Sequence, residues 1–112
     1  MTVQQIVDAL GLKVLSGDGL LERDVSGGYA SDLLSYVMAK AQPGEVWVTL
    51  QAHPNVVAVA GLTDVACVII TEGIQPDEMT LAKARQEGVI LLGTNEDTFR
   101  TVARLAAVGL EG

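Results

Sequence analysis

The chain has 112 residues, 49% of them hydrophobic, and its 14 acidic residues face 7 basic ones, which gives a formal net charge of −7. This length suits one domain, residues 1–112, with its own core, and the acidic balance argues against nucleic acid and anionic membrane surfaces as partners. No apolar run approaches the ~20 residues of a membrane-spanning helix, and the single cysteine, Cys67, favours a reducing, cytoplasmic setting.

The first quarter of the chain predicts a helix followed by a hairpin. Apolar residues at helical spacing predict the helix over Val3–Leu10, and Gly11 is a typical helix stop. Residues 12–15 are predicted to be extended. The turn at 16–19 contains two glycines, and it is predicted to return the chain into a second strand at residues 20–25.

The middle of the chain predicts alternating helices and strands. Ser31 is the predicted N-cap of a helix that runs to Ala41, where a Pro-Gly turn follows. Residues 45–50 are rich in Val, Trp and Thr, which favours a strand. Pro54 is well placed at the first position of a helix over residues 55–62.

The last third continues the same alternation. Residues 66–71 form a nearly continuous apolar run, as expected of a strand that is covered on both faces. Asp77 is predicted to cap a helix that ends at Glu87, and a buried strand follows at residues 89–92. Asn95 is predicted to cap the final helix, with two acidic residues in its first turn.

Short strands that alternate with helices of about ten residues predict a parallel sheet between helical layers. The expected fold class is therefore α/β. We expect a single three-layer domain with a mostly parallel sheet of four to five short strands and helices on both faces.

Ligands of open parallel sheets usually bind at the carboxyl ends of the strands. The turns predicted at those ends are polar or glycine-rich, and several lead into helix N-termini, which favour anions. These turns are equally explained by helix capping alone, because Ser, Asp and Asn are the usual caps. The candidate ligand-binding residues are Ser26, Gly27, Gly28, Ser31, Asp32, Thr49, Gln51, His53, Asn55, Thr71, Gly73, Thr94 and Asn95.

His53 is the only histidine of the chain. It suits acid–base chemistry, metal binding or phosphate transfer, or it is a surface histidine bonded to its own loop. No histidine or cysteine follows or precedes His53 at the spacing of a metal site. The sequence also contains no Walker-type phosphate loop and no nucleophile elbow. No catalytic residue, metal site or cofactor is therefore predicted. A small enzyme that uses His53 with Asp32 or Asn55 is the least favoured of three hypotheses.

The stretch from residue 24 to residue 28, Asp-Val-Ser-Gly-Gly, resembles the signature of the DRTGG domain family. Val25 and Ser26 stand where the family has arginine and threonine, so this chain lacks the arginine of the motif, whereas Ser26 keeps a hydroxyl group. Longer stretches also resemble sequences of this family, among them the segments W-V-T-L-Q-A-H-P-N and V-I-I-T-E-G.

The resemblance implies a regulatory or accessory module. Such domains stand beside CBS domains in some pyrophosphatases and within some phosphotransacetylases, and they are similar to the N-terminal domain of HPr kinase/phosphorylase. Family members commonly pair as homodimers. The expected function is a non-catalytic homodimer that senses a small anionic ligand such as an adenine nucleotide. The alternative is a structural accessory subunit that docks onto a larger redox or kinase enzyme complex without binding a ligand.

Overall fold

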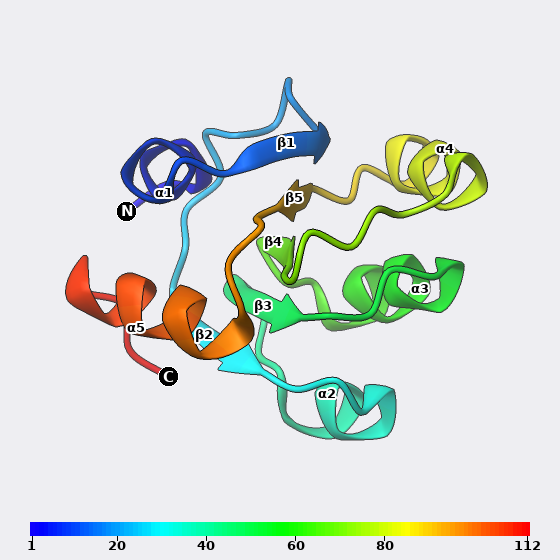
Figure 1. Cartoon of the computed structure of the whole chain (residues 1–112). Coiled ribbons are helices and arrows are strands. Elements are labelled where there is room, and N and C mark those ends of the chain that lie inside the picture. The colour runs from blue at the N-terminus through cyan, green and yellow to red at the C-terminus, as the bar shows by residue number, and fades with distance from the viewer.

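A five-stranded sheet lies between two layers of helices in the computed structural model, which describes residues 1–112 (Figure 1). The strand order is β1-β5-β4-β3-β2, in which β2 to β5 are parallel and β1 is antiparallel to β5. This confirms the predicted α/β class and the mostly parallel sheet. The strands are β1 (Lys13–Ser16), β2 (Gly27–Ala30), β3 (Glu45–Thr49), β4 (Cys67–Ile70) and β5 (Leu91–Gly93).

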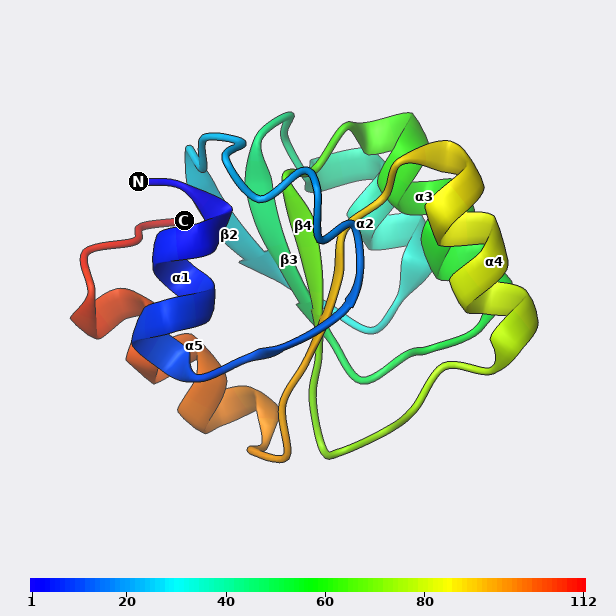
Figure 2. The same ribbon diagram turned by 90° about the horizontal axis from the view of Figure 1, so that it is seen from above.

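The helices divide between the two faces of the sheet (Figure 2). Helices α1 and α5 cover one face, and α2, α3 and α4 cover the other. None of them has the length and apolar content to cross a membrane. The helices are α1 (Val3–Leu10), α2 (Leu34–Lys40), α3 (Pro54–Thr63), α4 (Glu78–Glu87) and α5 (Thr98–Ala107).

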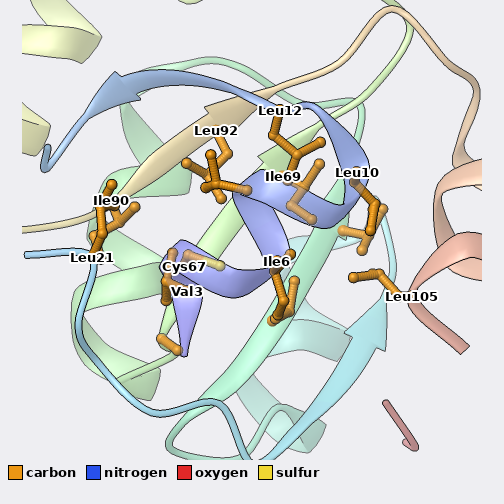
Figure 3. Packing of buried hydrophobic residues seen from close by; sticks show 14 residues of the cluster. Val3, Ile6, Leu10, Leu12, Leu21, Cys67, Ile69, Ile90, Leu92 and Leu105 are labelled. Atoms are coloured by element: carbon orange, nitrogen blue, oxygen red, sulfur yellow. The ribbon is translucent and has the colours of Figure 1, made fainter. Parts of the chain in front are cut away.

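Strand alternation explains the two cores. Val46 and Val48 of β3 point to the α1 side, whereas Trp47 between them points to the α2 side, as the period of two requires. Figure 3 shows the first core, where Ile6 of α1 and Ile69 of β4 are both fully buried. The central strands are buried on both faces, which is why their sequences read as continuous apolar runs.

The predicted hairpin near the N-terminus is wrong. Residues 20–23 form turns in place of a strand, with Leu20 N–H donating to Gly17 O at 2.8 Å and Arg23 N–H donating to Leu20 O at 3.4 Å, and Asp24 forms only an isolated antiparallel bridge with Thr2. Strand β1 pairs with β5, which is distant in sequence. Leu21 explains why the segment looked like a strand, because its side chain is buried in the first core while its backbone turns.

Two of the predicted helix caps are also wrong. The N-cap of helix α2 is Leu33, two residues later than Ser31, and the Ser31 hydroxyl accepts from Leu33 N–H at 3.2 Å in the loop before the helix. Helix α5 is capped by Asp97 and not by Asn95, since the Asp97 carboxylate accepts from Arg100 N–H at 2.7 Å. The cap at Asp77 is confirmed.

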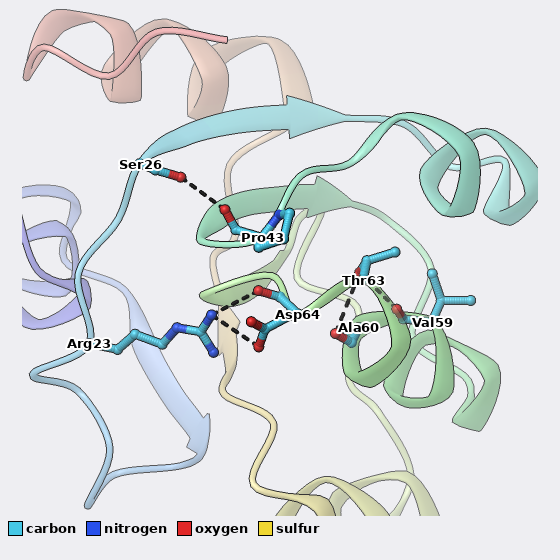
Figure 4. A network of polar contacts seen from close by, with 7 residues as sticks. All are labelled: Arg23, Ser26, Pro43, Val59, Ala60, Thr63 and Asp64. Atoms are coloured by element: carbon cyan, nitrogen blue, oxygen red, sulfur yellow. Dashed lines mark hydrogen bonds and ion pairs between the residues drawn. The ribbon is translucent and has the colours of Figure 1, made fainter.

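Polar contacts fix the loops at the amino ends of the parallel strands (Figure 4). Arg23 Nη2 donates to the backbone O of Asp64 at 2.8 Å and to its carboxylate at 3.1 Å. Ser26 Oγ donates to Pro43 O at 3.1 Å, which joins the segment before β2 to the segment before β3. Side chains at this end of the sheet are thus occupied in holding the fold.

Candidate functional site

Four loops meet at the opposite edge of the sheet, where the parallel strands end. Backbone hydrogen bonds join them: Thr71 N–H donates to Thr49 O at 3.0 Å, and Gly73 N–H donates to Thr94 O at 2.9 Å. This carboxyl edge consists of the loops that follow β2 to β5 and is distinct from the two outer strands of the sheet, β1 and β2. Ligands of open parallel sheets usually bind here. The candidate residues placed at it are Ser31, Asp32, Thr49, Gln51, Thr71, Gly73, Thr94 and Asn95.

Asp32 organises the loops after β2 and β3. Its Oδ1 atom accepts from Thr49 Oγ1 and from Leu50 N–H, both at 2.9 Å. Thr49 Oγ1 in turn accepts from Gln51 N–H at 3.1 Å. Trp47 lies beneath this cluster, fully buried, and its indole N–H donates to Ser31 O at 2.9 Å. The Asp32 and Thr49 side chains thus bind each other, which leaves them little capacity for a ligand.

The loops after β4 and β5 are fixed in a similar way. Thr71 is fully buried, and its hydroxyl shares a hydrogen bond of 2.8 Å with the hydroxyl of Thr98 at the start of α5. Glu72 and Gly73 both adopt left-handed backbone conformations, with φ of 66° and 68°. A Cβ on Gly73 would lie 3.0 Å from Asn95 Oδ1, so this position tolerates only glycine without a shift of Asn95.

A polar pocket of about 150 Å³ opens where β5 ends and β1 begins. Because β1 is antiparallel, its first residue, Lys13, pairs with Gly93, the last residue of β5. The positively charged residue Lys13 is therefore placed at the carboxyl edge of the parallel strands. The residues that line the pocket are Gly11, Lys13, Gln75, Gly93, Thr94 and Asn95.

Lys13 is the free cation of this edge. Its ammonium group makes no ion pair or hydrogen bond within the chain, and the residue is exposed. By contrast, Arg100 pairs with Asp97 at 2.6 Å, and Arg104 pairs with Glu96. An anion would therefore find its uncompensated positive charge at the corner between β1 and β5.

The capping carboxylate of α5 is unsuited to proton transfer near neutral pH. The backbone N–H of Arg100 donates to Asp97 and holds the pKa of this carboxyl below its usual value of 3.8. Burial raises the pKa of the Cys67 thiol to about 12, so this residue stays protonated. No three His, Cys, Asp or Glu side chains lie close enough to hold a metal ion.

Three candidate residues lie away from the carboxyl edge. The sequence places Gly27 and Gly28 after a strand, but they form the first half of β2, because the strand predicted before them does not exist. Ser26 lies at the amino ends of the strands, where its hydroxyl binds Pro43 O. The glycines permit a close backbone approach instead: a Cβ on Gly27 would lie 2.7 Å from Glu111 O.

His53 and Asn55 lie at the exposed start of α3. His53 is the N-cap residue, yet its side chain makes no capping hydrogen bond, and neither residue lines the polar pocket. No acidic partner binds the imidazole. The convergence of His53 with Asp32 that an enzyme would need finds no support in the hydrogen-bond pattern, because Asp32 binds Thr49 and Leu50.

Sequence reasoning missed Lys13, Gln75 and Gly11. Lys13 was assigned to an unremarkable extended piece, since nothing local shows that this strand runs against its neighbour. The available signal was charge: Lys13 is the only basic residue among the first 22.

Comparisons with known proteins agree with this architecture. The family model of the DRTGG domain matches residues 5–108. The crystal structure of the CBS and DRTGG domains of the regulatory region of Clostridium perfringens pyrophosphatase, complexed with the activator diadenosine tetraphosphate, superposes with a TM-score of 0.73 at 13% identity. The match covers 93% of this chain and 45% of that one, and at this identity it shows the fold. No curated protein matches the sequence.

Proposed function

The chain belongs to the DRTGG domain family, and from that premise we propose that it is a non-catalytic regulatory module that binds a small anionic ligand, such as an adenine nucleotide, at the carboxyl edge of its sheet. The observation that carries the proposal is the polar pocket around Lys13. It combines an unpaired ammonium group with the Thr94 hydroxyl and the Asn95 amide, the donors that a phosphate group requires.

The related regulatory region supports the choice of ligand class. That pyrophosphatase region carries a DRTGG domain next to CBS domains and was crystallised with a dinucleoside tetraphosphate. In the present chain, a phosphate at Lys13 would lie beside Gly93 and Thr94, whose backbone can approach it closely. The pocket of about 150 Å³ suits a phosphate group, and the remainder of a nucleotide would extend along the edge.

Thermal unfolding in the presence of AMP, ADP, ATP and diadenosine tetraphosphate tests the proposal. A ligand at a hundred times its dissociation constant stabilises the folded state by about 2.7 kcal/mol, which raises the melting temperature of a domain this small by about 10 °C. Lys13→Ala is expected to weaken binding about tenfold, because it removes one charge-assisted hydrogen bond.

Lys40→Ala is the matched control, because it removes the same charge from α2 on the other side of the sheet. It is expected to leave the affinity unchanged. Equal losses in the two variants would mean that binding responds to net charge alone. A flat response of the native chain to all four nucleotides would remove the nucleotide-sensing function.

A structural accessory subunit is the second candidate function. Several large apolar side chains are exposed, with Leu62, Met79 and Phe99 each more than 70% accessible, and such surface suits a protein partner. The homodimer is part of the first proposal, since two-fold pairs are the commonest assemblies. Light scattering at micromolar concentration distinguishes the two: a dimer is expected for the first proposal, and a monomer is expected for an accessory subunit whose partner is a different protein.

A further inference from the structure

The outer edge of β2 presents free backbone groups. Alternate residues of a strand direct their N–H and C=O groups to opposite sides. Ser31 N–H donates to Val48 O at 3.2 Å, so the residues in phase with Ser31 face β3, while Gly28 and Ala30 face outward. Gly28 N–H is bound by Glu111 O at 3.1 Å, and the N–H and C=O of Ala30 meet no partner beyond the edge.

An apolar cleft of about 190 Å³ runs beside this edge, between β2 and α5. The wall that β2 contributes to the cleft projects little, because Gly28 has no side chain and that of Ala30 is small. Val102 and Leu110 form the opposite wall. Pockets that enclose a whole drug-sized ligand measure ~300–1,000 Å³. This cleft is smaller, and its size suits a single apolar side chain.

The C-terminal residues of the chain lie beside this edge (Figure 1). Besides the bond from Gly28 N–H to Glu111 O, the Leu110 side chain covers Gly28, with its Cδ2 atom 3.4 Å from the place of a Cβ. One backbone bond holds this tail, whereas a strand of the length of β2 offers several. The edge is therefore only partly covered by residues 110–112.

The charge of the edge indicates what else would fit. Glu45 stands at its start, with Oε2 3.5 Å from the place of a Cβ on Gly27, whereas the Asp32 carboxylate beyond its end binds Thr49 and Leu50 on the β3 side. Residues 26–32 contain no cation. A second copy of this chain, with its net charge of −7, would bring further carboxylates to these positions, which disfavours self-pairing.

We propose that the outer edge of β2 is a docking site for an extended segment of a partner protein, in which an apolar residue is flanked by Lys or Arg. The segment displaces Glu111 and Gly112, adds a strand beside β2 and places its apolar side chain in the part of the cleft that β2 and α5 line. Main-chain bonds to Gly28 and Ala30 provide affinity, and this part of the cleft and the Glu45 carboxylate provide specificity. This site is independent of the Lys13 pocket, because β1 and β2 are opposite edges of the sheet.

A random heptapeptide library displayed on phage is the first probe of this site. We expect selection on the native chain to enrich peptides in which apolar residues alternate with Lys or Arg. One enriched peptide, made synthetically, is then titrated against two variants. Ala30→Pro is expected to weaken binding at least tenfold, because proline removes the outward N–H, and an edge strand tolerates this loss. Ala30→Ser keeps the N–H and is expected to bind within twofold of the native chain.

A chain that ends at Leu110 tests the role of the tail. It lacks the Glu111 carbonyl that competes for Gly28 N–H, so we expect it to bind the peptide several-fold more tightly. If Ala30→Pro does not fold, as judged by circular dichroism, the amide spectrum of the native chain decides. Binding at this edge must shift the amide signals of Gly28 and Ala30 more than those of Lys13 and Gly93.

The proposal is overturned by a library that yields no enriched sequence, or by peptides that bind Ala30→Pro as well as the native chain. It is also overturned if the chain ending at Leu110 binds no peptide.

Discussion

The two edges of the sheet are built in different ways. At β1, the buried Ser16 hydroxyl donates to Val89 O at 2.9 Å and accepts from Leu91 N–H at 3.1 Å, so a side chain fixes the strand next to an irregularity in its register. At β2, no side chain fixes the outer side, and one backbone bond from the C-terminal tail covers it. The Ser16 bonds thus fix the inner side of β1 to β5, whereas the outer side of β2 has only a backbone cover from the tail.

The largest expected difference in stability is between alanine substitutions at the two glycines next to these edges, Gly17 and Gly27. Gly17, at the end of β1, has a φ of 85°, and a Cβ there would lie 2.7 Å from Ile90 Cγ1 and 3.0 Å from Ile90 Cα. Gly17→Ala therefore combines left-handed strain with a clash against backbone, and it should lower the free energy of unfolding by about 2–4 kcal/mol. Urea unfolding at pH 7 measures this loss.

Gly27→Ala at the β2 edge is the matched substitution. Its Cβ would also meet an atom at 2.7 Å, but that atom is Glu111 O in the tail. The tail can move at the cost of one hydrogen bond, so the expected loss is below about 1 kcal/mol. A loss equal to that of Gly17→Ala would show that the tail is a fixed part of the fold, which would break the comparison.

The two serines give a second, smaller contrast. Ser16→Ala leaves Val89 O and Leu91 N–H without their buried partner, and it should reduce stability by about 2 kcal/mol. Ser26→Ala near β2 removes one exposed bond to Pro43 O and should change stability by less than about 0.5 kcal/mol. Thermal unfolding of both variants checks the difference, and similar melting temperatures would contradict it.

The smallest expected effect is an acid transition that involves both edges. Asp77 begins α4, which contacts β1, and Asp97 begins α5, which leads into the tail over β2. Backbone N–H groups, from Thr80 and Arg100 respectively, hold the pKa of each carboxyl below the ordinary 3.8. Their stabilisation is complete above that pH and is lost as the pH falls through the lowered pKa values of the folded chain.

Urea midpoints measured between pH 7 and pH 3 test these two carboxylates. We expect the decline below pH 4 to be shallower in Asp77→Asn and in Asp97→Asn, because asparagine still caps the helix but no longer titrates. If the pH profile of both variants matches that of the native chain, other carboxylates control the acid transition.

The sequence predicted those elements whose signals are local. Apolar runs fixed the central strands, and the cap at Asp77 was recognised because no competing cap precedes that helix. The predicted start of α5 is wrong because Asn95 and Asp97 are both good caps, and tertiary bonds that the sequence does not show, such as Thr98 to Thr71 and Glu72 N–H to Glu96 O, fix the segment between them. The strand predicted at residues 20–25 is wrong for another reason: the Leu21 side chain is buried, but burial of a side chain does not require a strand.

The candidate site was predictable in its position but not in its chemistry. Strand order alone brings Thr49, Thr71 and Thr94 to one edge, as the rule for parallel sheets requires. What the rule does not show is which of these side chains already bind each other. It also cannot reveal Lys13, because an antiparallel partner 80 residues away places that cation, as the pairing with Gly93 shows.

The single tryptophan gives the carboxyl edge an optical reporter. Trp47 has no solvent contact, yet its indole N–H is bound to Ser31 O, in the loop that also carries Asp32. Its fluorescence therefore arises from a dry environment with one polar partner, and any movement of that loop changes the environment of the ring. Ligand titrations can thus be followed by emission from the unlabelled chain, with no second tryptophan to obscure the signal.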